Sequence, residues 1–245
     1  MVILVLISFC TAFGSVGAIS YDTVSVDDDG PSGGNHFTSL PTAYSAVSPG
    51  GTIHVAAGTY VLTSLLHISK DVAIIGAGAD RVFIEGPVDT IALQVFNASL
   101  YLYGCTIRYA GTGVEVHCTD SGDHGSYLHK NAIYGTTGGD TGISFFVSND
   151  TSLELVITDN DIYDNIGYGI AGVIGPGAAA DVTIEDNRIY DNGGSGIQVK
   201  GSKCTYTLDF VGNEIWGNGE GQLNTGIDLE IEEPDYRFDS FVTIA

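Results

Sequence analysis

Hydrophobic and polar residues alternate along short stretches through most of the chain. Two clear examples are residues 153–157, Leu-Glu-Leu-Val-Ile, and residues 181–185, Asp-Val-Thr-Ile-Glu. A period of two places alternate side chains on opposite faces of an extended strand. Helical spacing is absent from these stretches, and frequent Gly, Asn and Asp would interrupt helices of useful length. The pattern predicts an all-β protein built from many short strands.

A four-residue motif recurs along the second half of the chain: Asn, any residue, Ile and an aromatic residue. Its copies begin at Asn131, Asn160, Asn187 and Asn213, and a degenerate copy begins at Cys105, so successive copies are 26, 29, 27 and 26 residues apart. Each copy continues into a Gly-aliphatic step, at residues 113–114, 142–143, 169–170, 196–197 and 226–227. A period in the twenties is typical of a solenoid in which each repeat forms one coil.

The repeated Asn has a structural explanation. Asn tolerates left-handed backbone conformations, and its side-chain amide can bond the chain above and below. If the coils stack in register, Asn131, Asn160, Asn187 and Asn213 lie in one column. We therefore predict an internal asparagine ladder.

The sequence also resembles the pectin lyase-like right-handed parallel β-helix superfamily over residues 24–230. The resemblance is carried by the opening coil, at residues 26–30, 37–40, 49–55 and 58–60, and by the next coil, at residues 72–78 and 82–86. It implies a single-stranded right-handed parallel β-helix of about seven coils, with an amphipathic N-terminal cap near residues 43–47. Members of this superfamily include lyases, hydrolases, epimerases, adhesins and viral spike proteins, and most contact polysaccharide along the outer face. The resemblance therefore implies a fold more than a reaction.

The N-terminus predicts export. Residues 2–13 form a nearly unbroken apolar run, and small residues follow up to Ala18. This arrangement predicts a signal peptide over residues 1–18 and a β-helix domain over residues 19–245, although no Lys or Arg precedes the apolar run and an uncleaved anchor is the alternative. No later segment is long and apolar enough to span a membrane. We expect a secreted or cell-surface protein with no membrane insertion after signal cleavage.

The net charge of the chain limits the ligands that it is expected to bind. The chain carries 30 acidic against 8 basic residues, a formal net charge of −22. Such a protein should repel nucleic acids, and a polyuronate would need a local cationic groove or bridging Ca²⁺. Residues 27–30, Asp-Asp-Asp-Gly, could hold Ca²⁺, but they lack EF-hand spacing and also read as a turn. We predict no cofactor and no dedicated metal site.

Three cysteines remain after signal cleavage: Cys105, Cys118 and Cys204. In an oxidising compartment, one disulfide and one spare thiol is the simplest arrangement. Burial of free thiols in the solenoid core is the alternative.

The repeat predicts a column of side chains that would suit a glycan. Arg108, Tyr134, Tyr163, Tyr190 and Trp216 occupy the same position on successive coils. The neighbouring Ile residues should point inward, so the rings should point outward. A bend after the Asn turn would break this alternation, and the alternative is an inward aromatic core stack. Aromatic faces pack well against the apolar faces of sugar rings. We therefore assign substrate binding to the four aromatic residues.

Catalytic signals are weaker, and no catalytic motif is complete. His124, His129 and Lys130 gather in an irregular stretch over residues 118–130 that could project as a loop and supply a base and a cation, although an ordinary surface loop explains them as well. Asp161 and Arg188 are further candidates. An ion-pair ladder in which Arg188 lies between Asp161 and Glu214 is the simpler explanation. A hydrolase would need paired carboxylates, for which the turns offer Asp159, Asp161, Asp164, Asp186 and Asp191.

Three functions remain open from the sequence alone. The first is a secreted protein that binds polysaccharide, and the second is a polysaccharide lyase, epimerase or hydrolase. The third is a structural solenoid of an envelope or adhesin assembly. A solvent-facing aromatic column separates the first from the third, and a base close to a cation or metal would favour the second.

Overall fold

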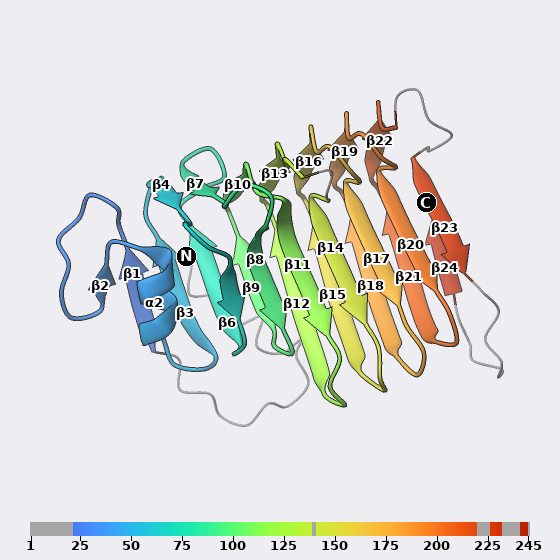
Figure 1. Ribbon diagram of the computed structural model, residues 1–245, viewed down its shortest axis with the longest axis horizontal. Coiled ribbons are helices and arrows are strands. Elements are labelled where there is room, and N and C mark those ends of the chain that lie inside the picture. The colour runs from blue at the N-terminus through green and yellow to red at the C-terminus, as the bar shows by residue number, and fades with distance from the viewer. Residues whose placement is uncertain (1–21, 139–140, 220–225, 232–240, 245) are drawn as a thin grey trace.

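The computed structural model describes residues 22–138, 141–219, 226–231 and 241–244, and these wind into a right-handed parallel β-helix (Figure 1). The predicted signal peptide, residues 1–18, lies outside the described residues. None of the described helices is long and apolar enough to cross a membrane.

Three parallel sheets form the sides of the β-helix. Sheet A contains, in spatial order, β2 (His36–Phe37), β1 (Thr23–Val26), β3 (Gly51–Val55), β6 (Val72–Gly76), β9 (Leu100–Tyr103), β12 (Asp123–His129), β15 (Ser152–Thr158), β18 (Ala179–Glu185), β21 (Thr205–Val211) and β24 (Phe241–Ile244). Sheet B contains β4 (Gly58–Val61), β7 (Val82–Glu85), β10 (Thr106–Arg108), β13 (Ala132–Tyr134), β16 (Asp161–Tyr163), β19 (Arg188–Tyr190) and β22 (Glu214–Trp216). Sheet C contains β5 (Leu66–Ile68), β8 (Ile91–Phe96), β11 (Thr112–Cys118), β14 (Ile143–Val147), β17 (Ile170–Ile174), β20 (Ile197–Gly201) and β23 (Ile227–Ile231).

Each coil passes through sheets A, B and C in turn, and the predicted repeat sets the register. Ile162 pairs with Ile133 on one side and with Ile189 on the other. All three side chains are fully buried. Strands β3 to β23 complete seven coils, so the prediction of about seven is confirmed.

A short helix covers the N-terminal end, as predicted. Helix α2 (Leu40–Ala46) begins three residues before the expected segment because Pro41 suits the first turn of a helix. Leu40 and Ala43 are fully buried, and the helix packs against β1, β2 and β3. Figure 1 shows α2 beside these first strands.

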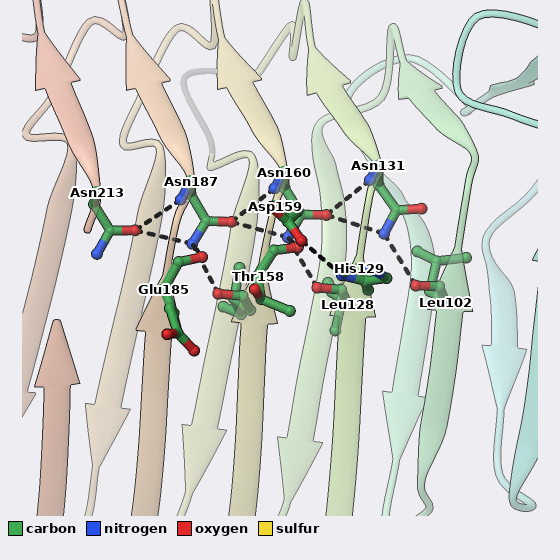
Figure 2. Close-up of polar contacts among 11 residues, drawn as sticks. Leu102, Leu128, His129, Asn131, Thr158, Asp159, Asn160, Glu185, Asn187 and Asn213 are labelled. Carbon is green, nitrogen blue, oxygen red and sulfur yellow. Dashed lines mark hydrogen bonds and ion pairs between the residues drawn. The ribbon is translucent and has the colours of Figure 1, made fainter. Parts of the chain in front are cut away.

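The asparagine ladder is confirmed, and it runs along the turn between sheets A and B (Figure 2). The Oδ1 atom of Asn160 accepts hydrogen bonds from the backbone N–H of Asn131 at 2.9 Å and from its Nδ2 at 3.1 Å. Asn187 and Asn213 repeat the pattern on the next two coils. The degenerate copy also joins it, since the backbone N–H of Cys105 donates to Oδ1 of Asn131 at 3.0 Å.

A second ladder, which the sequence analysis missed, lies at the turn after sheet B. Nδ2 of Asn165 donates to Oδ1 of Asn192 at 2.9 Å, and Asn192 donates to Asn218 at the same distance. The signal was present, because each of these residues follows a motif Asn by five positions. The two ladders therefore lie at the two ends of strands β16, β19 and β22, which are each three residues long.

The prediction of one disulfide is wrong for the described residues. Cys105, Cys118 and Cys204 are free and buried. Cys105 precedes β10, Cys118 ends β11 and Cys204 precedes β21, so they belong to different turns and sheets. They fill the core as small apolar groups, which was the alternative prediction.

Candidate functional site

The outer face of sheet B presents two columns of side chains, which we call the sheet B strip. Strands β13, β16, β19 and β22 are each three residues long, and the central Ile points inward in the first three of them. The two flanking side chains of each strand therefore point outward. The aromatic column of the strip consists of Tyr134, Tyr163, Tyr190 and Trp216. The polar column consists of Asp161, Arg188 and Glu214.

The aromatic column is a continuous stack. Ring centroids of Tyr134 and Tyr163 are 4.8 Å apart with an interplanar angle of 17°. The corresponding values are 4.9 Å and 3° for Tyr163 and Tyr190, and 4.5 Å and 1° for Tyr190 and Trp216. The predicted outward direction is confirmed, because the three tyrosines are partly exposed and Trp216 is 45% exposed.

The stacking changes what the column can offer to a ligand. The rings repeat at the spacing between coils, so they lie face to face along the axis. Tyr163 and Tyr190 have neighbours on both faces, and they present ring edges and hydroxyl groups outward. Trp216 ends the stack, and its second face has no ring partner among the described residues. The prediction that aromatic faces along the whole column contact sugar rings is therefore corrected, because stacking covers the faces of Tyr163 and Tyr190.

The polar column contains one bidentate ion pair. Arg188 donates from Nε to Oδ1 of Asp161 and from Nη2 to Oδ2, both at 2.5 Å. This bidentate pairing raises the pKa of the guanidinium. Glu214 lies in register on the other side of Arg188, as predicted, but the hydrogen bonds of Arg188 go to Asp161.

A shallow groove of about 380 Å³ follows this polar column, on the side of the first asparagine ladder. Its charged lining residues are Asp159, Asp161, Asp186, Arg188 and Glu214. Asp159 and Asp186 precede ladder asparagines and have positive φ values of 55° and 53°. This left-handed turn directs the chain into sheet B and leaves both side chains exposed at the rim.

His129 lies beside Asp159, one of the residues that line the groove. Its Nδ1 atom is 3.5 Å from Oδ2 of Asp159, a contact drawn in Figure 2. Its ring also lies against Tyr103 and Tyr127, at centroid distances of 5.4 and 5.8 Å. Burial lowers the pKa of His129, as does the nearby charge of Lys130, while Asp159 opposes the shift. Around neutral pH the imidazole is therefore uncharged and able to accept a proton.

His124 does not join it, because residues 118–130 are not a projecting loop. Residues 123–129 form strand β12, which pairs with β9 and β15. His124 bonds Asp120 at 2.7 Å at the start of this strand. Lys130, with a φ of 56°, is the left-handed residue before Asn131. The sequence analysis missed the strand because Gly125 and Ser126 interrupt its apolar pattern.

A second aromatic group lies on sheet A and was also missed. Tyr101 stacks on Tyr127 at 5.5 Å, and Tyr103 lies 5.4 Å from His129. The signal was the alternation of these residues with Leu102 and Leu128, which are fully buried. This group is separate from the sheet B strip.

The acidic turn proposed as a weak Ca²⁺ site does bring its carboxylates together. Side-chain oxygens of Asp27, Asp28 and Asp29 lie within 4.8 Å of one another. One of them is already engaged, since Oδ2 of Asp28 accepts a hydrogen bond from the backbone N–H of Thr59 at 2.9 Å. A hydrogen bond with Asp27 raises the pKa of Asp29. These contacts explain the cluster as a turn held against the next strand.

Fold and repeat together define a solenoid of the parallel β-helix class. The family described as "Right handed beta helix region" matches residues 84–232, which is more than half of the chain. The chain belongs to this family. A search by sequence among curated proteins found no match.

Solved structures match this chain at low sequence identity. The crystal structure of pectate lyase Pel9A matches with a TM-score of 0.60 and 18% identity, over 84% of this chain and 57% of that one. The chain thus spans little more than half the length of that lyase. The ORF18 protein of Geobacillus virus E2 matches with a TM-score of 0.38 and 12% identity, over 89% and 61% of the two chains. The A-module of the Azotobacter vinelandii mannuronan C-5 epimerase AlgE6 matches with a TM-score of 0.26 and 15% identity, over 74% and 71%.

Proposed function

We propose that this protein is secreted or displayed at the cell surface and binds polysaccharide along the sheet B strip. The observation that carries the proposal is the parallel course of two outward columns, one aromatic and one polar, with a groove beside them. An extended glycan laid along the solenoid axis would meet the same kinds of group on each coil.

Each part of the strip has a distinct role in this proposal. The open face of Trp216 packs against one sugar ring, and the hydroxyl groups of Tyr163 and Tyr190 bond sugar hydroxyls. Asp161, Arg188 and Glu214 supply further donors and acceptors. Because these groups are fixed by buried strands and ladders, little conformational entropy is lost on binding.

Paired double variants test the proposal. Tyr163→Ala/Tyr190→Ala removes the middle of the stack, and Tyr101→Ala/Tyr127→Ala removes a stacked pair from sheet A. A glycan array on the parent protein identifies a ligand. We expect the sheet B variant to bind it at least about tenfold more weakly, a loss of about 1.4 kcal/mol, and the sheet A variant to bind like the parent.

Melting curves of both variants separate binding from folding. A folded sheet B variant with parental affinity would place binding elsewhere. An unfolded one would favour the structural solenoid, because the stack would then be required for the fold. Trp216→Ala provides an independent check, since this exposed ring ends the stack and its removal leaves the three tyrosines together.

A second candidate function is a polysaccharide lyase or epimerase that uses His129 as the base. It is favoured by the uncharged state of this imidazole and by the 3.5 Å contact with Asp159 at the groove. The test is an assay for unsaturated uronate products or C-5 inversion on uronate polymers, with His129→Gln as the inactive variant. Product formation that survives His129→Gln would remove His129 from this role.

A further inference from the structure

Resting on the proposed function, we infer that the glycan bound by the sheet B strip is cationic: a polysaccharide of amino sugars whose amines are free. The charges that surround the aromatic column carry this inference. They define which sugar substituents the strip can accept.

The groove side of the column has an excess of negative charge. Asp159, Asp161, Asp186 and Glu214 line it together with a single cation, Arg188. Arg188 is already held by Asp161 through two hydrogen bonds. No ion pair among the described residues gives Asp159, Asp186 or Glu214 a Lys or Arg partner. Asp159 contacts His129 at 3.5 Å but, like Asp186 and Glu214, has no Lys or Arg partner among these residues, so all three can bind a cationic ligand.

The opposite side of the column is acidic as well. Asp164 and Asp191 directly follow Tyr163 and Tyr190, with positive φ values of 52° and 53°. Both are exposed. Carboxylates thus flank the stacked rings on both sides, and equivalent ones are separated by one coil, about 4.8 Å. A ligand that carries one positive charge per repeating unit would meet a carboxylate at each step.

Anionic, neutral and cationic glycans differ in how their charge interacts with the carboxylates of the strip. A polyuronate would place its carboxylates against those of the strip, in a chain of net charge −22 with 8 basic residues. A neutral glycan would partly desolvate the acids without compensating their charge. An ammonium group donates three charge-assisted hydrogen bonds to carboxylates and also binds to the face of an indole such as Trp216. A glycan with free amines therefore has the most favourable interaction with the strip.

The test compares two ligands that differ only at the amine: a glucosamine hexamer and the matching N-acetylglucosamine hexamer. Calorimetry at about pH 5 keeps the carboxylates ionised and the sugar amines protonated. We expect the free-amine hexamer to bind at least about tenfold more tightly, and its advantage to fall when salt rises from about 50 to about 500 mM. A galacturonate hexamer should bind most weakly of the three.

Matched charge variants separate a local site from general attraction to an acidic protein. Asp159→Asn/Asp186→Asn removes two charges from the groove, and Asn suits the left-handed backbone of both positions. Glu154→Gln/Asp181→Asn removes two exposed charges from sheet A. We expect the groove variant to lose most of the preference for the amine and the sheet A variant to keep it.

The outcomes are distinguishable. Equal losses in the two variants would mean diffuse attraction and would overturn the inference. If the acetylated hexamer binds as tightly as the free amine through the sheet B strip, the proposed function holds and the inference fails. If the array and the hexamers yield no ligand that depends on Tyr163 and Tyr190, both fail.

Discussion

The side-chain oxygen of Asn187 accepts two hydrogen bonds from Asn160, one from its backbone N–H at 2.9 Å and one from its Nδ2 at 3.0 Å. Nδ2 of Asn187 in turn donates to the backbone oxygen of Ile157 at 2.7 Å. Asn187 is fully buried, so water cannot replace these partners. One side chain thus joins adjacent coils where the chain turns from sheet A into sheet B.

Replacing Asn187 with Ala should therefore leave buried backbone groups without partners. We expect the free energy of unfolding to fall on the order of 1–3 kcal/mol in chemical denaturation. Asn35→Ala, at an exposed position, is the control and should change stability by less than about 0.5 kcal/mol. A change of only a few tenths in Asn187→Ala would contradict an internal ladder.

A second prediction concerns the glycine that begins the Gly-aliphatic step. A Cβ atom at residue 169 would lie 2.6 Å from the backbone oxygen of Gly196 and 2.6 Å from Cγ2 of Ile189. Because Gly169 does not have a positive φ, an Ala there without this overlap would stabilise the fold by about 0.4–1 kcal/mol. We expect Gly169→Ala instead to destabilise it by about 1–3 kcal/mol. Chemical denaturation measures the change in the free energy of unfolding, and a stabilising Gly169→Ala substitution would contradict the predicted overlap.

The fold could be predicted well from the sequence because the same residue types recur at the same structural positions on each coil. Asn at one turn, Ile in the core and Gly at the close approach recur together, so the register followed from spacing alone. The outward direction of Tyr163 and Tyr190 followed from the buried Ile between each ring and its polar neighbour. Their mutual stacking depends on side-chain rotamers, which spacing does not determine.

The candidate catalytic site was predicted less well. Asp159 and His129 are 30 positions apart in sequence, and they meet because adjacent coils align. The grouping of His124 with His129 failed because β12 separates them along one strand, and nearness in sequence did not produce a site. The disulfide prediction failed for a similar reason. The number of cysteines does not show which side chains lie close enough to pair.

A third prediction follows from the buried thiols. Burial raises the pKa of both Cys105 and Cys118 to about 12. The reactive thiolate is therefore scarce at neutral pH, and the core also blocks access to reagents. We expect Cys105, Cys118 and Cys204 to resist a maleimide reagent in the native protein and to react fully in denaturant without reductant. Intact mass before and after labelling measures this, and labelling that requires prior reduction would restore the disulfide.

A fourth prediction concerns the opposing charges around His129. Its pKa should lie below the ordinary 6.5, because burial disfavours the imidazolium and Lys130 repels it. Asp159→Asn removes an attractive charge and should lower this pKa further, whereas Lys130→Gln removes a repulsive one and should raise it. Titration of the imidazole signals by NMR measures all three proteins. Shifts of the same sign in the two variants would contradict the arrangement.

The same lowered pKa makes folding depend on pH in a defined direction. Between the lower folded pKa and the unfolded pKa of about 6.5, the unfolded chain binds more protons at His129 than the native protein does. Stability should therefore fall as pH drops from about 6.5 towards the folded pKa, and the loss should end below it. His129→Gln removes this contribution, so unfolding measured at about pH 7.5 and about pH 5 should show a smaller loss in the variant than in the parent. A parent protein that loses no more stability than His129→Gln over this range would show that His129 titrates alike in the folded and unfolded chains.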